Sequence, residues 1–177
     1  MKIEIPTRAI AITSLLLLIQ GCASNPTAGN KVMTDAESCS ALKHVVEQSK
    51  TDFNTLKDGT RHPDYDHDHW DAKPIFNGAE CDVIKWGSRG SNFVCNWEKD
   101  NEQAAKKDYA SGLATIESCL SKEWTSSPIA GAKGEAKRFA KAGETTVIDV
   151  RVYQERAPAN GWLTGVSVGP AINRDAR

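Results

Sequence analysis

Apolar residues recur at helical spacing in the segment that begins at Thr34. Thr34 and Glu37 form the Ser/Thr-x-x-Glu pattern of a capping box, which marks the start of a helix. Core-facing positions then follow three or four residues apart until Asp58-Gly59, at Cys39, Leu42, Val46, Ser49, Phe53 and Leu56. The pattern predicts a first helix with one core-facing stripe. Residues 60–79 contain charges, histidines and prolines without periodicity, and they predict a long loop.

Two short runs rich in Val, Ile, Phe and Trp come next, at residues 80–86 and 91–97. They flank the turn sequence Gly87-Ser88-Arg89-Gly90, so they predict a hairpin. Asp100 and Gln103 then open a second helix, which we expect to end near Lys122. Its apolar face repeats at Ala105, Tyr109, Gly112, Leu113, Ile116 and Leu120.

The last third of the chain alternates strand and turn patterns. Residues 126–134 are rich in Ser, Pro and Gly and predict a loop. Three strands are then expected at residues 135–141, 145–154 and 162–168. In the middle one, Thr146, Ile148, Val150 and Val152 point one way, while Asp149 and Arg151 point the other. This alternation is typical of a sheet with one solvated face.

The predicted order is helix, two strands, helix, three strands. It favours an α+β domain in which an antiparallel sheet of about five strands is packed on one face by two helices.

The first 22 residues form a pattern of their own. Lys2 and Arg8 precede an apolar stretch from Ala9 to Ile19, which is too short to span a bilayer. The segment Ile19-Gln20-Gly21-Cys22 resembles the lipobox of bacterial lipoproteins. The resemblance implies cleavage before Cys22 and acylation of that cysteine, and the alternative is an ordinary secretory signal. Because each buried acyl methylene contributes about 0.8 kcal/mol, three chains would hold the protein on a membrane.

The same resemblance implies a location. In many such lipoproteins an Asp after the cysteine favours retention in the inner membrane, and this chain has Ala23 there. We therefore expect an outer-membrane anchor, with the protein facing the periplasm. Residues 23–33 are rich in small and polar residues and predict a flexible tether. The expected organisation is a signal peptide at 1–21, a lipidated cysteine and tether at 22–33, one domain at 34–170 and a tail at 171–177.

Length and charge narrow the function classes. Removal of residues 1–21 from the 177 leaves 156, enough for one domain with a sizeable core. The whole chain has a net charge of −1, and loss of Lys2, Glu4 and Arg8 brings it to −2. This near balance argues against nucleic acid as a partner. The loop Gly131–Gly134 lacks the Gly-Lys-Ser/Thr ending of a phosphate loop, so a nucleotide is not expected either.

Four cysteines remain beside Cys22, an even number that favours disulfides in an exported chain. Three pairings are possible. Cys81 and Cys95 lie at nearly equal distances from the glycine turn, so they would face each other in the hairpin. The remaining pair joins Cys39 to Cys119, which two antiparallel neighbouring helices would allow. The predicted fold is thus disulfide-stabilised.

The order of a helix, a cysteine-containing hairpin, a second helix and later strands also resembles small uncharacterised exported proteins of proteobacteria. The resemblance covers about half the chain and implies no activity. It depends on Cys81, Trp86, Cys95, Trp97, Tyr109, Cys119, Leu120 and Trp124.

Residues 61–71 hold three of the four histidines and four aspartates. In an extended segment His67 and His69 project to the same side, and His62 can fold over them. An aspartate, Asp64 or Asp71, would complete a site suited to Zn²⁺, Ni²⁺ or Cu²⁺. The alternative is a solvated loop whose polar residues bind nothing.

Catalytic motifs are absent from the sequence. Ser88 lies in a glycine turn, but there is no Gly-x-Ser-x-Gly pattern around it. Most of the five tryptophans are expected in the core. Trp70 and Trp86 are the candidates for a partner-binding patch, because a core role is hardest to assign to them. The sequence therefore predicts a non-enzymatic lipoprotein that binds another envelope component, probably unknown protein in class, with metal binding through the His62–His69 segment as the alternative.

Overall fold

The computed structural model describes residues 32–63, 67–155 and 161–171. The first half contains α1 (Asp35–Gln48), the 3₁₀ turn η1 (Ser49–Thr51), β1 (Asp58–Pro63), β2 (Asp68–Ala72), β3 (Glu80–Lys85), the 3₁₀ turn η2 (Gly87–Arg89) and β4 (Ser91–Lys99). The second half contains α2 (Glu102–Cys119), β5 (Trp124–Pro128), β6 (Glu135–Lys141), β7 (Thr146–Gln154) and β8 (Trp162–Pro170). Each half is thus one helix followed by four strands.

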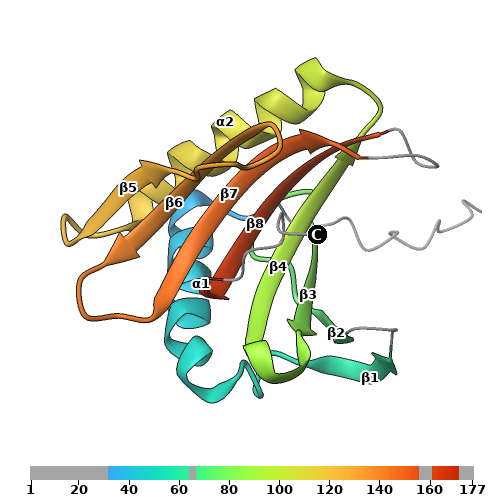
Figure 1. Cartoon of the computed structure of the whole chain (residues 1–177), viewed down its shortest axis with the longest axis vertical. Helices are drawn as coiled ribbons and strands as arrows, with labels where there is room; N and C mark the ends of the chain where they lie inside the picture. Colours follow the sequence, from blue (N-terminus) through green and yellow to red (C-terminus); the bar gives the residue numbers. More distant parts are fainter. Residues whose placement is uncertain (1–31, 64–66, 156–160, 172–177) are drawn as a thin grey trace, which may run out of the picture. The chain divides into compact units, whose positions relative to one another are not determined.

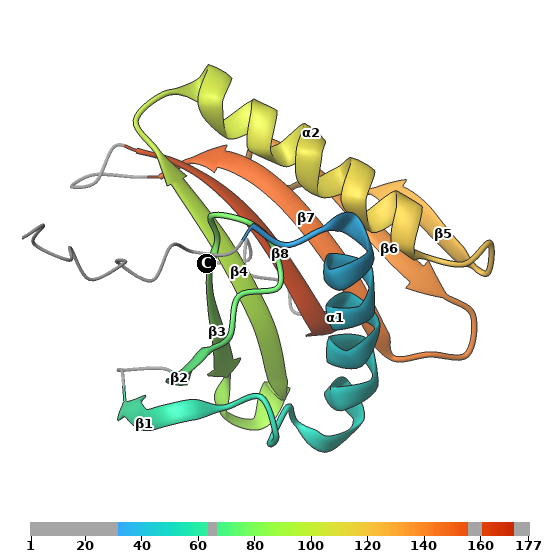
Figure 2. The same ribbon diagram turned by 180° about the vertical axis from the view of Figure 1, so that it is seen from behind.

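The strands of both halves form one antiparallel sheet with the order β1-β2-β3-β4-β8-β7-β6-β5. Each half contributes a four-strand meander, and the two meanders join through their last strands, β4 and β8. Both helices lie on the same side of the sheet, behind it in Figure 1 and in front of it in Figure 2. The other side, which we call the open face, is turned toward the viewer in Figure 1.

The predicted fold class is confirmed, but the predicted number of strands is wrong. The sheet of the described residues has eight strands, because β1 and β2 form within the expected loop 60–79 and β5 within the segment before the expected strand at 135. β1 and β5 are the two edges of the sheet. Every residue of β1 is exposed, as are four of the five in β5, so neither strand has the alternation that marks a half-buried strand.

The first helix is shorter than the apolar pattern predicts. α1 ends at Gln48, and the chain turns back through Asp52 and Phe53, whose φ angles are 54° and 55°. The turn still buries Phe53 completely, so this residue joins the core from outside the helix. Phe53 thus satisfied the helical spacing in the sequence without being helical.

The hydrophobic core fills the space between the helices and the sheet. Val83, Phe93 and Trp97 share the helix-facing side of the sheet with Cys81 and Cys95, as the hairpin pattern predicts. Leu42, Val45 and Ile116 come from the helices, and Phe139, Ile148, Val150, Val166 and Val168 from the second meander.

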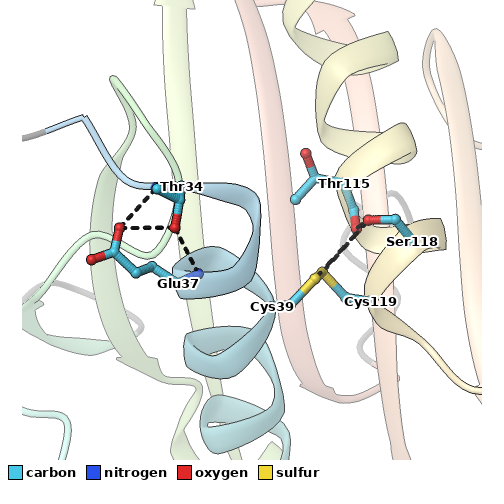
Figure 3. Close-up of a disulfide and its surroundings, with 6 residues drawn as sticks. All are labelled: Thr34, Glu37, Cys39, Thr115, Ser118 and Cys119. Carbon is cyan, nitrogen blue, oxygen red and sulfur yellow. Dashed lines mark hydrogen bonds between the residues drawn. A yellow bond between two sulfur atoms is a disulfide. The ribbon is translucent and has the colours of Figure 1, made fainter.

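Two disulfides stabilise the domain, in the pairing that the sequence favours. Cys81 and Cys95 are directly opposite each other in β3 and β4. Cys39, near the start of α1, bonds to Cys119 at the end of α2 (Figure 3). The second bond spans 80 residues and links the helix of one half to the helix of the other.

The start of the domain is fixed by side-chain hydrogen bonds. The capping box forms as predicted, with Glu37 N donating to the Thr34 hydroxyl and Thr34 N donating to the Glu37 carboxylate (Figure 3). One residue earlier, Met33 N donates to Asn77 Oδ1 at 2.7 Å, and Asn77 Nδ2 donates to Met33 O at 2.9 Å. The last residue of the expected tether is therefore already bound to the domain.

Candidate functional site

The open face of the sheet has a row of polar side chains across its middle. Residues that pair across antiparallel strands share a face, and this row runs Asp71, Asp82, Val94, Ser167, Asp149 and Arg138 from β2 to β6. A second row runs Asn96, Gly165 and Arg151 across β4, β8 and β7. Helices cover the opposite side, so candidate binding groups concentrate on this face.

A hollow of about 200 Å³ lies on the open face where β4, β8 and β7 meet. We call it the open-face hollow. Its lining includes Asn92, Val94, Asn96, Asp149, Arg151, Tyr153, Leu163, Gly165, Ser167 and Pro170 from the three strands, and Lys133 from the loop between β5 and β6. Hollows also lie beside β5, but no buried polar atom that lacks a partner within the described chain lines them. The open-face hollow is the better candidate site.

Gly165 creates the space at the centre of this hollow. It lies between Asn96 and Arg151 in the sheet, and a Cβ atom added to it would be 3.0 Å from Asn96 Oδ1. Glycine weakens a strand interior, and it often marks a place where another group approaches the backbone. Any side chain at this position would occupy the hollow.

Asp149 forms the charged wall of the hollow. Its carboxylate accepts two hydrogen bonds from Arg138, at 2.6 Å from Nε and 2.7 Å from Nη2, and Arg151 Nη2 lies 3.5 Å from Oδ2. Only 7% of the Asp149 side chain is exposed. Hydrogen bonding to Asp149 is the main cause that raises the pKa of Arg138 above its usual value, so this ion pair is fixed at all physiological pH.

Asn92 places an unsatisfied acceptor in the wall of the hollow. Its Nδ2 donates to Pro170 O at 3.2 Å, but Oδ1 is buried and has no hydrogen-bond partner within the described chain. Gly169 makes room for this side chain, because a Cβ there would lie 2.6 Å from Asn92 Nδ2. Buried acceptors are rarely left without a donor in folded proteins, so Oδ1 is a natural contact for a ligand.

The predicted metal ligands that the structure describes gather at the β1–β2 end of the sheet. His62 in β1 pairs with His69 in β2, and their rings stack with centroids 5.0 Å apart. The His67 ring lies 6.0 Å from that of His69. Asp71 is on the same face of β2, two residues after His69, whereas Asp64 lies outside the described residues.

Asp82 lies opposite Asp71 on β3 and interacts with the same histidines. Burial is the largest cause that raises the pKa of Asp82, and the charges of Asp71 and Glu80 raise it further, while His69 and His62 act against them. Despite this gathering, no three His, Cys, Asp or Glu side chains of residues 32–63, 67–155 and 161–171 are placed to hold a metal ion. The geometry of this part of the chain therefore does not support the metal site.

The two tryptophans predicted to bind a partner are both partly buried. Trp70 packs against the core, and Lys57 Nζ lies 4.5 Å from the centroid of its ring. Burial lowers the pKa of Lys57, against the attraction of Asp52. Trp86 contacts the ring of His67, with centroids 5.0 Å apart. The exposed large hydrophobic side chain of the described residues is Val32.

Sequence reasoning missed the residues of the open-face hollow, although part of the pattern was visible. The alternation in residues 146–152 placed Asp149 and Arg151 on the second face of the sheet. Gly165 within an apolar strand was a further indication of close approach. The sequence contained no sign that Asn92, Asn96 and Lys133 would join them, because β4 meets β8 across more than sixty residues of chain.

Cys22, the predicted lipidation site, lies outside the described residues. Neither helix of the described domain has the length and apolar character needed to cross a membrane. Comparisons with protein-family models, with curated proteins and with solved structures found no match to this chain.

Proposed function

We propose that this chain is an outer-membrane lipoprotein that faces the periplasm and has a non-enzymatic binding role in the cell envelope. The anchor is the acylated Cys22, and the ligand site is the open-face hollow. The lipobox resemblance at Ile19–Cys22 supports the anchor. The two disulfides agree with an oxidising compartment, where such bonds persist.

The open-face hollow is the observation on which the binding role depends. It combines a glycine floor, a fixed ion pair and the unsatisfied Asn92 Oδ1 within one concave surface. Small-molecule sites are typically concave surfaces with a few such polar groups. At about 200 Å³ the hollow is smaller than the roughly 300–1,000 Å³ of sites for drug-sized ligands, so it suits a small envelope molecule.

Palmitate labelling tests the anchor. Cells that express the full chain, or its Cys22→Ser variant, are grown with labelled palmitate and fractionated. We expect label on the unmodified protein and its recovery with the outer membrane, with both lost in Cys22→Ser. Label that persists in the variant, or an unlabelled parent protein, would contradict lipidation at Cys22.

Native mass spectrometry tests the binding role. Protein purified from membranes in mild detergent is incubated with small molecules extracted from the cell envelope. Gly165→Ala fills the hollow, and the backbone of Gly165 does not have a positive φ, so alanine fits without strain. The matched control is Gly112→Ala in α2 on the other side of the sheet, where a Cβ would lie 4.0 Å from Val166 Cγ2.

We expect an envelope molecule to be retained by the parent protein and by Gly112→Ala, and to be lost from Gly165→Ala. Equal retention by all three proteins would mean that the ligand binds elsewhere, and no retention by the parent protein would count against the binding role.

A further inference from the structure

The charges around the open-face hollow indicate what kind of small molecule it suits. This step rests on the proposed binding role. Both oxygens of Asp149 already accept hydrogen bonds from Arg138, so this carboxylate is occupied and its charge is compensated. Arg151 lines the same wall with its guanidinium 3.5 Å from Asp149. Together with Lys133, the described groups at the hollow comprise three cations and one carboxylate, which favours an anionic ligand.

Lys133 is the cation at the rim. It lies in the loop between Gly131 and Gly134, it is exposed, and it has no ion-pair partner within the described part of the chain. Gly134 fixes this loop against β7, because a Cβ there would lie 2.1 Å from Val152 O. The ammonium group of Lys133 is thus held near the hollow and remains able to donate to a ligand anion.

The opposite wall requires a donor rather than an anion. Asn92 Oδ1 is a buried acceptor without a partner within the described residues, and Asn96 Oδ1 lies over Gly165. A ligand that carried only an anionic group would leave Asn92 Oδ1 unsatisfied, whereas a hydroxyl group would donate to it. The two walls therefore suit two different groups of one molecule.

We propose that the open-face hollow binds a small hydroxy-carboxylate, with the carboxylate toward Lys133 and a hydroxyl group donating to Asn92 Oδ1. The cavity volume equals that of roughly seven water molecules at about 30 Å³ each, which suits a molecule with a single ring. A sugar acid has this combination of size, charge and hydroxyl groups.

Isothermal titration with three ring compounds of similar size tests the assignment on the full chain in detergent. D-glucuronate carries a carboxylate and hydroxyl groups, D-glucose carries hydroxyl groups alone, and cyclohexanecarboxylate carries a carboxylate alone. We expect glucuronate to bind about tenfold more tightly than either of the others, the factor that one charge-assisted hydrogen bond contributes. Equal affinities for the three probes, or no binding of glucuronate, would overturn the proposal.

Two pairs of variants identify the site. Lys133→Gln should reduce the preference for glucuronate over glucose, while Lys107→Gln, which removes a charge from an exposed position on α2, should not. Gly165→Ala should abolish glucuronate binding, and Gly112→Ala should leave it unchanged. An unaltered preference in Lys133→Gln would contradict the assigned role of this lysine.

The outcomes separate this assignment from the proposed function. If glucose binds as tightly as glucuronate and both are lost in Gly165→Ala, the ligand class is wrong but the hollow remains the binding site. If none of the probes binds while an envelope molecule is retained in the mass-spectrometry experiment, the ligand class is again wrong. Failure of that retention experiment would instead remove the proposed function itself.

Discussion

Asp149 has the most constrained surroundings of the charged residues described above. Its carboxylate is almost completely buried, and it lies between Arg138 and Arg151. A buried carboxylate is tolerated only when its charge and its hydrogen bonds are satisfied, and the bidentate contact with Arg138 provides both. The alternation in β7 predicted a solvated position for this residue, but pairing with a side chain of β6 buried it instead.

Replacing Asp149 should destabilise the domain. We expect Asp149→Ala to lower the free energy of unfolding by an amount at the lower end of the about 3–5 kcal/mol typical of broken buried pairs, because Arg138 is 28% exposed. Urea denaturation measures the change. The double variant Asp149→Leu with Arg138→Met should cost less than the sum of the single changes. Glu123→Ala, which breaks an exposed pair with Lys141, is the control and should have a much smaller effect.

Asp82 should make stability depend on pH. Its pKa is raised in the folded state, so the folded protein binds a proton more readily than the unfolded chain does. Stability therefore falls as pH rises from the ordinary Asp pKa of 3.8 to the raised value, and the cost persists at higher pH. Asp82→Asn should stabilise the protein at pH 7, by less than about 1 kcal/mol as for opposed like charges on neighbouring strands.

Thermal unfolding at pH 7 and at pH 4 checks this prediction. The gain from Asp82→Asn should shrink at the lower pH, where the wild-type carboxyl becomes protonated. Glu98→Gln, an exposed change on β4, is the control. A gain that is the same at both pH values would mean that the charge of Asp82 is not its cause.

At the scale of elements, the sequence predicted the inner strands and the helices but not the edges. The interior strands β3, β4, β6, β7 and β8 fall within a few residues of their predicted ranges, because each has one face in the core. β1, β2 and β5 were missed. The edge strands β1 and β5 are paired on one side and exposed on most residues, so burial imposes no apolar alternation on them. Pro128 at the end of β5 also resembles a loop residue, although an edge strand tolerates proline.

The two disulfides should contribute unequally to stability. Loop-closure entropy predicts a contribution of about 4.5 kcal/mol for Cys39–Cys119, which spans 80 residues, and about 3 kcal/mol for Cys81–Cys95, which spans 14. We expect the double variant Cys39→Ala with Cys119→Ala to be less stable than Cys81→Ala with Cys95→Ala. Urea denaturation of both double variants measures the difference. The opposite order would show that packing around Cys81 and Cys95 outweighs chain entropy.

At the scale of the whole described domain, the pairing of β4 with β8 joins the two halves. Each half alone would leave one of these strands at a sheet edge, and the open-face hollow would not exist, because its lining comes from β4 in one half and from β7 and β8 in the other. This long-range pairing also explains why sequence reasoning did not find the site. Local patterns gave the face of Asp149 and Arg151 but not the neighbouring strand.

Hydrogen exchange should reflect this arrangement. We expect the amides of β4 and β8, at the centre of the sheet, to exchange most slowly, and those of β1 and β5 to exchange fastest among the strands. Exchange followed by mass spectrometry at peptide resolution measures these rates. Protection in β1 equal to that in β4 would contradict the prediction and would indicate that something covers the β1 edge.

The bond between Cys39 and Cys119 has a consequence for the biogenesis of an exported chain. Cysteines that emerge from a membrane one after another would oxidise most readily in that order, which gives Cys39–Cys81 and Cys95–Cys119. The folded domain instead has one bond enclosed within the span of the other. Maturation therefore requires that Cys39 wait as a thiol for the second half, or that an early bond be exchanged, and a strain without a disulfide isomerase should accumulate the mispaired protein.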